Sequence, residues 1–406
     1  MDKKNFTVFS LPVIVAALGY FVDIYDLLLF SIIRIPSLRS FGLSDDQIAK
    51  DGLLIINVQM IGLLLGGILW GVLGDKKGRL KVLYASIILY SIGNIANGFV
   101  NTVGMYALVR FITGVGLAGE LGAGVTLVTE LLPKEKRGLG TSIIAGVGII
   151  GAVVAFFVKE IFPWRTCYFI GGGLGIALLL LRTNVLESGM FANIVNSKVS
   201  KGNFFMLFTN KQRLKKYLSS ILIGLPTWYV IGILITFSKE FGARMNVSGA
   251  IDPGKAVMYS YTAISISSFI AGLLSLWLQS RKKVLYIYYF ITAIGIWWFF
   301  NLHDSTSSRL YLVSVVLGIG SGFWTIFVTM AAEQFGTNLR ATVATTAPNM
   351  IRGSLVLVSL LFTWLQGMTS YFNSGWITGI VVMVIGLIAV IIADETYHKD
   401  LNYVEV

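Results

Sequence analysis

The sequence is poor in charge, cysteine and histidine. Only 13% of its 406 residues are Asp, Glu, Lys or Arg, about half the share of an ordinary soluble domain. The single cysteine, Cys167, excludes an intramolecular disulfide, and two histidines, His303 and His398, cannot build a histidine-rich metal site. No G-x-x-x-x-G-K-[ST] motif occurs, so nothing indicates a bound ATP. We therefore expect no metal, no cofactor and no ATP-driven pump.

Hydrophobic residues make up 55% of the chain, and its mean hydropathy is +0.78. A helix needs about 20 apolar residues to cross the hydrocarbon core of a bilayer. Twelve runs are long enough: 10–35, 53–73, 80–100, 103–131, 138–158, 166–185, 217–238, 256–279, 284–302, 308–332, 341–366 and 372–393. The sequence thus predicts an all-α integral membrane protein with twelve transmembrane helices.

The basic residues divide unevenly between the two sides that these helices define. Of the 32 Lys and Arg, 21 fall on the side of the termini and nine on the other, while Arg110 and Arg352 lie within apolar runs. Basic loops stay in the cytoplasm. We therefore expect a multi-pass protein of the inner or plasma membrane with both termini cytoplasmic, in contact with lipid and with no nucleic-acid partner.

The chain also divides into two related halves. Residues 187–216 form the longest polar stretch, which indicates a cytoplasmic linker between an N-terminal bundle (1–186) and a C-terminal bundle with a short tail (217–406). Glu130 is followed seven residues later by Arg137, and Glu333 is followed seven residues later by Arg340, at an offset of 203 residues. Parallel six-helix repeats are a transporter architecture.

Several motifs resemble the major facilitator superfamily. The loop GVLGDKKGRLK at 71–81 is similar to the family signature after helix 2. Residues 110–120, 186–188 and 394–396 resemble motifs of its sugar-porter and metabolite:proton symporter branches, whereas GLPTWYVIG at 224–232 departs from the glutamine-rich helix 7 of sugar porters. The resemblance implies two pseudo-symmetric six-helix bundles that alternate access to a central site, with a substrate other than a hexose.

The resemblance also implies a cytoplasmic gate that holds one conformation closed. Its candidate residues are Gly71, Asp75, Gly78, Arg79, Glu130, Arg137, Glu333 and Arg340. Gly71 and Gly78 would permit a close approach and a tight turn. The alternative is that the charged residues are solvated loop charges, with little effect on stability.

Five charged residues lie in the interior of the predicted helices, away from the helix ends, and a charge near the bilayer centre costs at least about 2.5 kcal/mol. They are Asp23, Asp26, Arg110, Glu120 and Arg352, and their charges sum to −1 when all are ionised. We expect Arg110 to pair with Asp23 or Asp26, and one of the three carboxyls to exchange a coupled proton. The alternative is a permanent ion pair between helices 1 and 4.

Substrate contacts are predicted around Arg352, which follows Pro348 and Asn349 at a place where the helix should distort. A fixed cation there suits an anionic substrate, although it could instead pair with Glu120 or bind freed backbone carbonyls. Helices 1, 4, 7 and 10 line the cavity in the family that the chain resembles. The remaining candidates for the pocket are Tyr25, Asn349, Trp228, Tyr229, Tyr261 and Trp324.

These observations predict a secondary active transporter, a monomer that carries a small polar metabolite with a proton. An organic anion such as a carboxylate is the favoured substrate. The alternatives are a proton antiporter that exports siderophores or drugs, and a symporter of a sugar or zwitterion. A receptor, a scaffold or a membrane enzyme is disfavoured, because the embedded charges are retained and no nucleophile, metal or cofactor constellation is evident.

Overall fold

The computed structural model describes residues 7, 9–132, 134–182 and 204–399. This part of the chain is built from helices, without a strand. Twelve helical spans in it are long and apolar enough to cross a membrane, as predicted. The chain is therefore a multi-pass membrane protein.

The N-terminal half holds the first six spans. Its helices are α1 (Leu11–Arg39), α2 (Asp45–Lys77), α3 (Arg79–Asn97), α4 (Val103–Leu117), α5 (Glu120–Leu131), α6 (Lys134–Ile149), α7 (Gly151–Ile161) and α8 (Trp164–Arg182). The predicted spans 103–131 and 138–158 are each divided into two helices. The division of the first matters, because it separates Arg110 from Glu120.

The C-terminal half follows the same plan. Its helices are α10 (Met206–Thr209), α11 (Lys211–Ile223), α12 (Leu225–Tyr229), the π-helix η2 (Val230–Ile235), α13 (Ser238–Arg244), α14 (Pro253–Leu278), α15 (Arg281–Phe300), α16 (Ser307–Ser321), α17 (Trp324–Glu333), α18 (Thr337–Gln366) and α19 (Tyr371–Ile392). Two of its helices thus begin inside the stretch predicted as a linker. The predicted span 217–238 is divided near Gly224 and Pro226, where proline removes a backbone donor.

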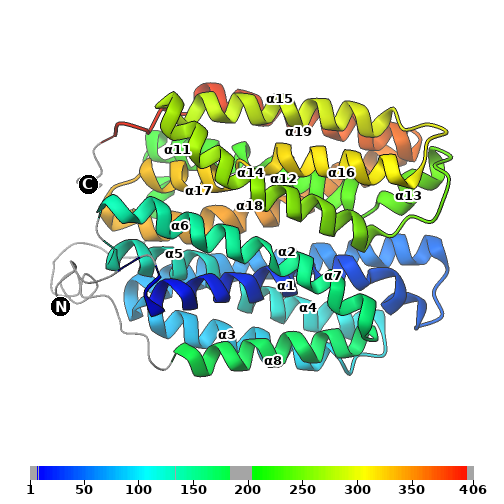
Figure 1. Ribbon diagram of the computed structural model, residues 1–406, viewed down its shortest axis with the longest axis horizontal. Coiled ribbons are helices and arrows are strands. Elements are labelled where there is room, and N and C mark those ends of the chain that lie inside the picture. The colour runs from blue at the N-terminus through cyan, green and yellow to red at the C-terminus, as the bar shows by residue number, and fades with distance from the viewer. Residues whose placement is uncertain (1–6, 8, 133, 183–203, 400–406) are drawn as a thin grey trace.

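The two halves lie one above the other, with their helices along the long axis of the molecule (Figure 1). They meet where α2 and α5 pack on α18, and where α1, α6 and α7 pack on α14. The end at which α1 begins and α8 ends is called the basic end here, because the sequence places most Lys and Arg there. The turn between α1 and α2 lies at the opposite end.

An interruption of one helix recurs in both halves. α4 ends at Leu117 and α5 begins at Glu120, while α16 ends at Ser321 and α17 begins at Trp324. Both pairs are 204 residues apart, close to the offset of the acidic and basic motifs. The repeat in the sequence is therefore also a repeat in backbone geometry.

Two glycines fit their predicted geometry. Gly78 joins α2 to α3 with φ +101°, a backbone conformation that favours glycine. A Cβ on Gly71 would come within 3.1 Å of the Thr346 methyl group on α18. Gly71 therefore permits close packing between the two halves near the basic end.

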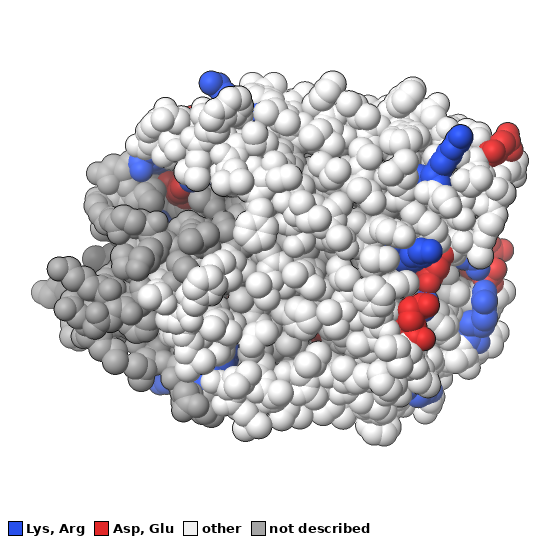
Figure 2. Space-filling view, viewed as in Figure 1, with Lys and Arg blue, Asp and Glu red and all other residues white. Residues whose placement is uncertain are grey.

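Charged side chains are nearly absent from the middle of the face in Figure 2 and gather toward its ends. Large apolar side chains such as Ile266, Leu273 and Trp277 of α14 are exposed instead. An exposed apolar band of this extent indicates contact with lipid.

The C-terminal segment after α19 is held on the N-terminus of α15. The Glu395 carboxylate accepts hydrogen bonds from the Ser280 hydroxyl and from the backbone N–H groups of Arg281 (2.9 Å) and Lys282 (3.2 Å). Partial burial would raise the pKa of Glu395, but these hydrogen bonds to its charged form hold the pKa below the ordinary value of 4.5. The carboxylate thus caps α15 and satisfies its free donors.

We expect Glu395→Gln to destabilise the protein by about 1 kcal/mol, the usual cost of losing a partly exposed helix cap. A carboxyl whose pKa is depressed by folding stabilises above its unfolded pKa and loses that effect as the pH falls. The variant should therefore melt at a lower temperature than the wild type at pH 7. This difference in melting temperature should disappear as the pH falls below 4.5. Asp394→Asn, at the neighbouring residue, is the control. It should change neither the stability at pH 7 nor its dependence on pH.

Candidate functional site

A narrow cavity of about 20 Å³ lies between the two halves. It is lined from the N-terminal half by α1 and α6, and from the C-terminal half by α12, η2, α14, α16, α17 and α18. The lining residues are Tyr20, Ile24, Ile149, Thr227, Trp228, Ile231, Tyr261, Ile264, Ser321, Trp324 and Arg352. A mainly apolar cavity with a few converging polar groups is the usual form of a small-molecule site.

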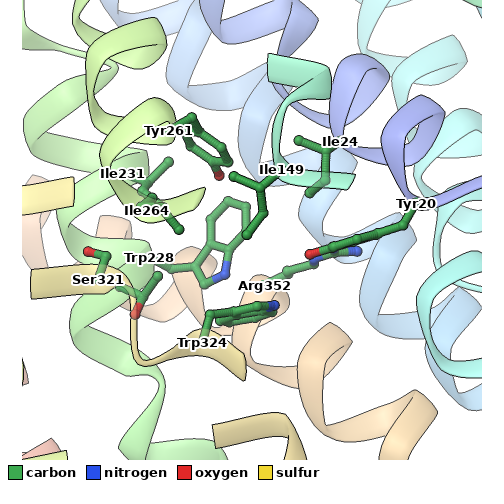
Figure 3. A pocket seen from close by; sticks show the side chains of 11 residues that line it. Tyr20, Ile24, Ile149, Trp228, Ile231, Tyr261, Ile264, Ser321, Trp324 and Arg352 are labelled. Carbon is green, nitrogen blue, oxygen red and sulfur yellow. The ribbon is translucent and has the colours of Figure 1, made fainter. Parts of the chain in front are cut away.

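The polar atoms of the lining are incompletely bonded. Four polar groups of the lining are buried and have no hydrogen-bond partner in the described part of the chain: the Trp228 indole N–H, the Thr227 and Ser321 hydroxyls and the Arg352 Nε–H. In Figure 3 the Tyr20 side chain extends toward Arg352 and toward the indoles of Trp228 and Trp324. Buried donors are rarely left unpaired in native proteins, so these groups can bind a ligand or water.

Arg352 joins the two halves through an ion pair. Its Nη2 lies 3.3 Å from Asp23 Oδ2, and both side chains are buried. Its Nη1 lies 3.4 Å from the Asn349 side-chain oxygen, and the Asn349 amide nitrogen donates to the backbone oxygens of Ala118 (2.8 Å) and Thr345 (2.9 Å). Arg352 thus pairs with Asp23. Asn349 contacts the Arg352 guanidinium and does not line the cavity. α18 continues through Pro348, so the predicted distortion does not divide this helix.

Arg110 pairs with Asp26 inside the N-terminal half. Arg110 Nη1 lies 2.8 Å from Asp26 Oδ1, and its Nη2 donates to the Asp26 backbone oxygen at 3.0 Å. Its Nε donates to Gln59 (3.2 Å), and its guanidinium lies over the Tyr168 ring. Both charges are fully buried, and neither residue lines the central cavity.

Glu120 pairs with a residue that sequence reasoning placed elsewhere. Its two carboxylate oxygens accept from the Arg182 guanidinium, and both side chains are buried. Arg182 is the last residue of α8, so from the sequence it counts as one more basic residue at the cytoplasmic side. A Cβ on Gly19 would collide with this pair. Glu120 therefore contacts α1 and α8, away from the lining of the cavity.

Arg182 changes the charge of the buried set. The five residues singled out from the sequence carry −1, but with Arg182 the set has three carboxylates and three arginines, arranged as three pairs. The sum of −1 obtained from the sequence therefore leaves out one buried arginine, Arg182. When all six residues are ionised, the set is already neutral.

A further ion pair that sequence reasoning missed closes the opposite end of the bundle. Arg34 of α1 is fully buried, and its Nη2 lies 2.7 Å from Glu240 Oε1 of α13. Arg34 also donates to the backbone oxygens of Ile48 and Thr236 and lies over the Phe237 ring. Because Arg34 lies at a predicted helix end, its burial could not be read from the sequence.

Two predicted pocket aromatics lie outside the cavity. Tyr25 donates its hydroxyl to the Cys167 backbone oxygen (2.9 Å) within the N-terminal half, and Tyr229 donates to the Gly375 backbone oxygen (2.6 Å) within the C-terminal half. Trp228, Tyr261 and Trp324 do line the cavity. Tyr20, Thr227 and Ser321 were missed, because a tyrosine or short hydroxyl in an apolar helix carries little signal of its own.

Half of the candidate gate can be described. Glu333 pairs with Arg281 (3.0 Å) and accepts from the Thr396 hydroxyl (2.7 Å), while Arg340 donates to the Phe335 backbone oxygen (3.1 Å). The side chains of the other charged candidates, Asp75, Arg79, Glu130 and Arg137, lie outside the described residues. The gate therefore remains a prediction.

Two like bundles of membrane-spanning helices around a buried polar site define a multi-pass membrane transporter. The family model of the Major Facilitator Superfamily matches residues 16–352. The chain belongs to this superfamily, as its motifs predicted, and it is a transporter rather than an enzyme.

Individual relatives are distant. The chain is 25% identical over 337 residues to the putative niacin/nicotinamide transporter NiaP of Bacillus subtilis, covering 81% of each chain. It is 24% identical to the niacin transporter NiaP of Acinetobacter baylyi, covering 96% of this chain and 94% of the relative. A crystal structure of a D-xylose-proton symporter shares the fold, with a TM-score of 0.72 at 18% identity over 96% of this chain and 99% of the other.

Proposed function

We propose that this transporter imports a small organic monocarboxylate together with one proton across the cell membrane, with its basic end in the cytoplasm. The neutrality of the buried charge set carries the proposal. One bound proton makes the set +1, and one bound monoanion returns it to zero. A carrier that holds both ligands can then change between its outward-open and inward-open conformations with no net buried charge. Either ligand alone leaves one uncompensated charge inside the membrane, where a charge is costly.

Arg352 supplies the link between the two ligands. It is the cation that reaches the cavity, and its present partner is Asp23 at 3.3 Å. A substrate carboxylate can take this place, because a guanidinium binds carboxylates through paired N–H groups. Asp23 would then be a buried carboxylate without a cation, and such a group binds a proton. Substrate binding thereby favours proton binding.

The other residues that line the cavity indicate what the rest of the substrate, beyond its carboxylate, should be. Trp228, Trp324 and Tyr261 offer flat apolar surfaces, which suit an aromatic or heteroaromatic ring. The unpaired indole N–H of Trp228 and the hydroxyls of Thr227 and Ser321 could bond to polar atoms on that ring. Niacin, named for two relatives, is a pyridine carboxylic acid and combines these features.

Melting temperatures of the purified protein with nicotinate or nicotinamide test the proposal. The two compounds share a ring and differ in the charged carboxylate. Selective binding to the native state raises the melting temperature, so we expect nicotinate and benzoate to stabilise at pH 5.5 and nicotinamide to have little effect. Equal stabilisation by nicotinamide, or stabilisation by xylose alone, would contradict an anion site.

Trp228→Phe should weaken nicotinate binding about fivefold, because it removes one neutral hydrogen bond while keeping an aromatic ring. Isothermal titration calorimetry gives the change in Kd. Trp277→Phe is the matched control. Trp277 also lies in the C-terminal half, but its side chain on α14 is 79% exposed and lies outside the cavity. A similar loss in both variants would show that Trp228 acts through folding rather than through contact.

A further inference from the structure

A row of buried polar side chains on α3 takes no part in the site described above. Tyr90, Ser91 and Asn94 are at most 2% exposed. The Tyr90 and Ser91 hydroxyls and both polar atoms of the Asn94 amide have no hydrogen-bond partner among the described residues. Since buried polar atoms in native proteins bond to protein or to ordered water, this row requires water.

The row lies among the buried charges of the N-terminal half. The Tyr90 hydroxyl interacts electrostatically with Glu120 and Arg182, and also with Asp23 and Asp26. The Asn94 side chain is close enough to the Asp26 carboxylate to interact with it, and Oδ2 of that carboxylate has no other partner among the described residues. The polar row therefore faces Asp26 at one end and Glu120 at the other.

Glycines of α8 leave room for these groups. A Cβ on Gly175 would come within 2.0 Å of the Ser91 hydroxyl, and one on Gly171 would come within 3.4 Å of the Asn94 amide nitrogen. None of these residues lines the central cavity. The contact between α3 and α8 is thus polar and separate from the proposed substrate site.

We propose that Tyr90, Ser91 and Asn94 hold a chain of buried waters through which the coupled proton leaves the α1 carboxylates and reaches Glu120 and Arg182 near the basic end. The inference rests on the proton coupling proposed above. It gives the proton an exit that does not cross the substrate cavity, so substrate release and proton release need not share one opening.

The step breaks and forms only O–H bonds. The proton leaves the carboxyl of Asp23 or Asp26, passes between waters beside Asn94 and Tyr90, and is held on the Glu120 carboxylate before its release to water. The charged groups facing this route are Asp23 and Asp26 of α1, Arg110 of α4, Glu120 of α5 and Arg182 of α8. Arg182 is near the surface end of its helix, and its backbone oxygen accepts from the Tyr84 hydroxyl (2.7 Å).

Radiolytic footprinting of the ligand-free protein in H₂¹⁸O tests for the waters. Hydroxyl radicals form from water held beside a side chain, so we expect ¹⁸O on Tyr90 despite its burial. Tyr289 is also buried, but its hydroxyl donates to the Ile223 backbone oxygen (2.6 Å), so it is the control that should stay unlabelled. An unlabelled Tyr90 would overturn the water chain, whatever the protein transports.

Transport assays test whether the route carries protons. In proteoliposomes, Tyr90→Phe and Asn94→Leu should lower proton-driven accumulation of nicotinate at least about tenfold, while nicotinate exchange without a pH gradient continues. Tyr289→Phe should leave both activities unchanged. Accumulation at the wild-type level in both α3 variants would overturn the route.

The outcomes also separate this inference from the proposed function. Wild-type protein that carries nicotinate without moving protons contradicts the proposed coupling, and the proton route with it. Labelled Tyr90 with intact coupling in the α3 variants contradicts the route alone.

Discussion

Arg352→Gln should abolish measurable binding of monocarboxylates, with Kd rising about 100-fold or more. The variant removes charge-assisted hydrogen bonds to a desolvated carboxylate, which are worth about 1.5–3 kcal/mol each, and every 1.4 kcal/mol is tenfold in Kd. Calorimetric titration with nicotinate measures the loss. Arg352→Lys keeps the charge but loses the planar pair of donors, so it should retain part of the affinity.

The single variant also leaves Asp23 buried without its cation, which can itself cost about 3–5 kcal/mol of stability. Asp23→Asn combined with Arg352→Gln avoids this, because it replaces the ion pair by two neutral amides of similar size. The double variant should fold with a melting temperature near that of the wild type and still fail to bind nicotinate. Binding at wild-type affinity in this variant would exclude Arg352 as the carboxylate site.

The fold was accessible from the sequence because the bilayer imposes strong constraints. Each span must be long and apolar, so the runs of hydrophobic residues predict the number of helices directly. What hydropathy cannot show is an interruption inside a span. The break at Ala118 and Gly119, between α4 and α5, leaves the apolar run of 103–131 intact in composition, so hydropathy gives no sign of it.

The charges were found more readily than their partners. A charge in the middle of an apolar run is conspicuous, and so the sequence could predict that Arg110 pairs with Asp23 or Asp26, of which the structure selects Asp26. Arg182 and Arg34 lie at the ends of runs, where a basic residue normally reports topology. Only the packing of α5 and α8 on α1 shows that Arg182 is buried against Glu120, 62 residues away.

The side of α1 that meets the cavity could have been predicted more closely. Tyr20, Asp23 and Ile24 follow the i, i+3, i+4 spacing of one helical face. Tyr25 is five residues from Tyr20 and thus about 140° around the helix, which agrees with its hydrogen bond to Cys167 inside the N-terminal half. Choosing pocket aromatics by helix membership alone missed Tyr20 and included Tyr25.

Asp23→Asn should separate substrate transport from the proton. The asparagine is uncharged and does not compete as an anion for Arg352, so the Kd for nicotinate should fall, by about tenfold for a 1.4 kcal/mol gain. It also has no carboxyl to take up a proton when the substrate binds. Nicotinate binding should therefore lose its pH dependence between pH 5.5 and 7.5, and uphill accumulation should be lost while exchange persists.

Asp26→Asn provides the contrast, because Asp26 holds Arg110 within one half and does not contact Arg352. Its loss leaves a fully buried arginine unpaired, so we expect lower stability, by about 3–5 kcal/mol, and no gain in nicotinate affinity. Stopped-flow measurement of proton uptake with a pH-sensitive dye, on adding nicotinate to each variant, distinguishes the two aspartates. If proton uptake survives Asp23→Asn and disappears in Asp26→Asn, the coupled proton binds the Asp26 and Arg110 pair, and substrate competition for Arg352 is not what drives it.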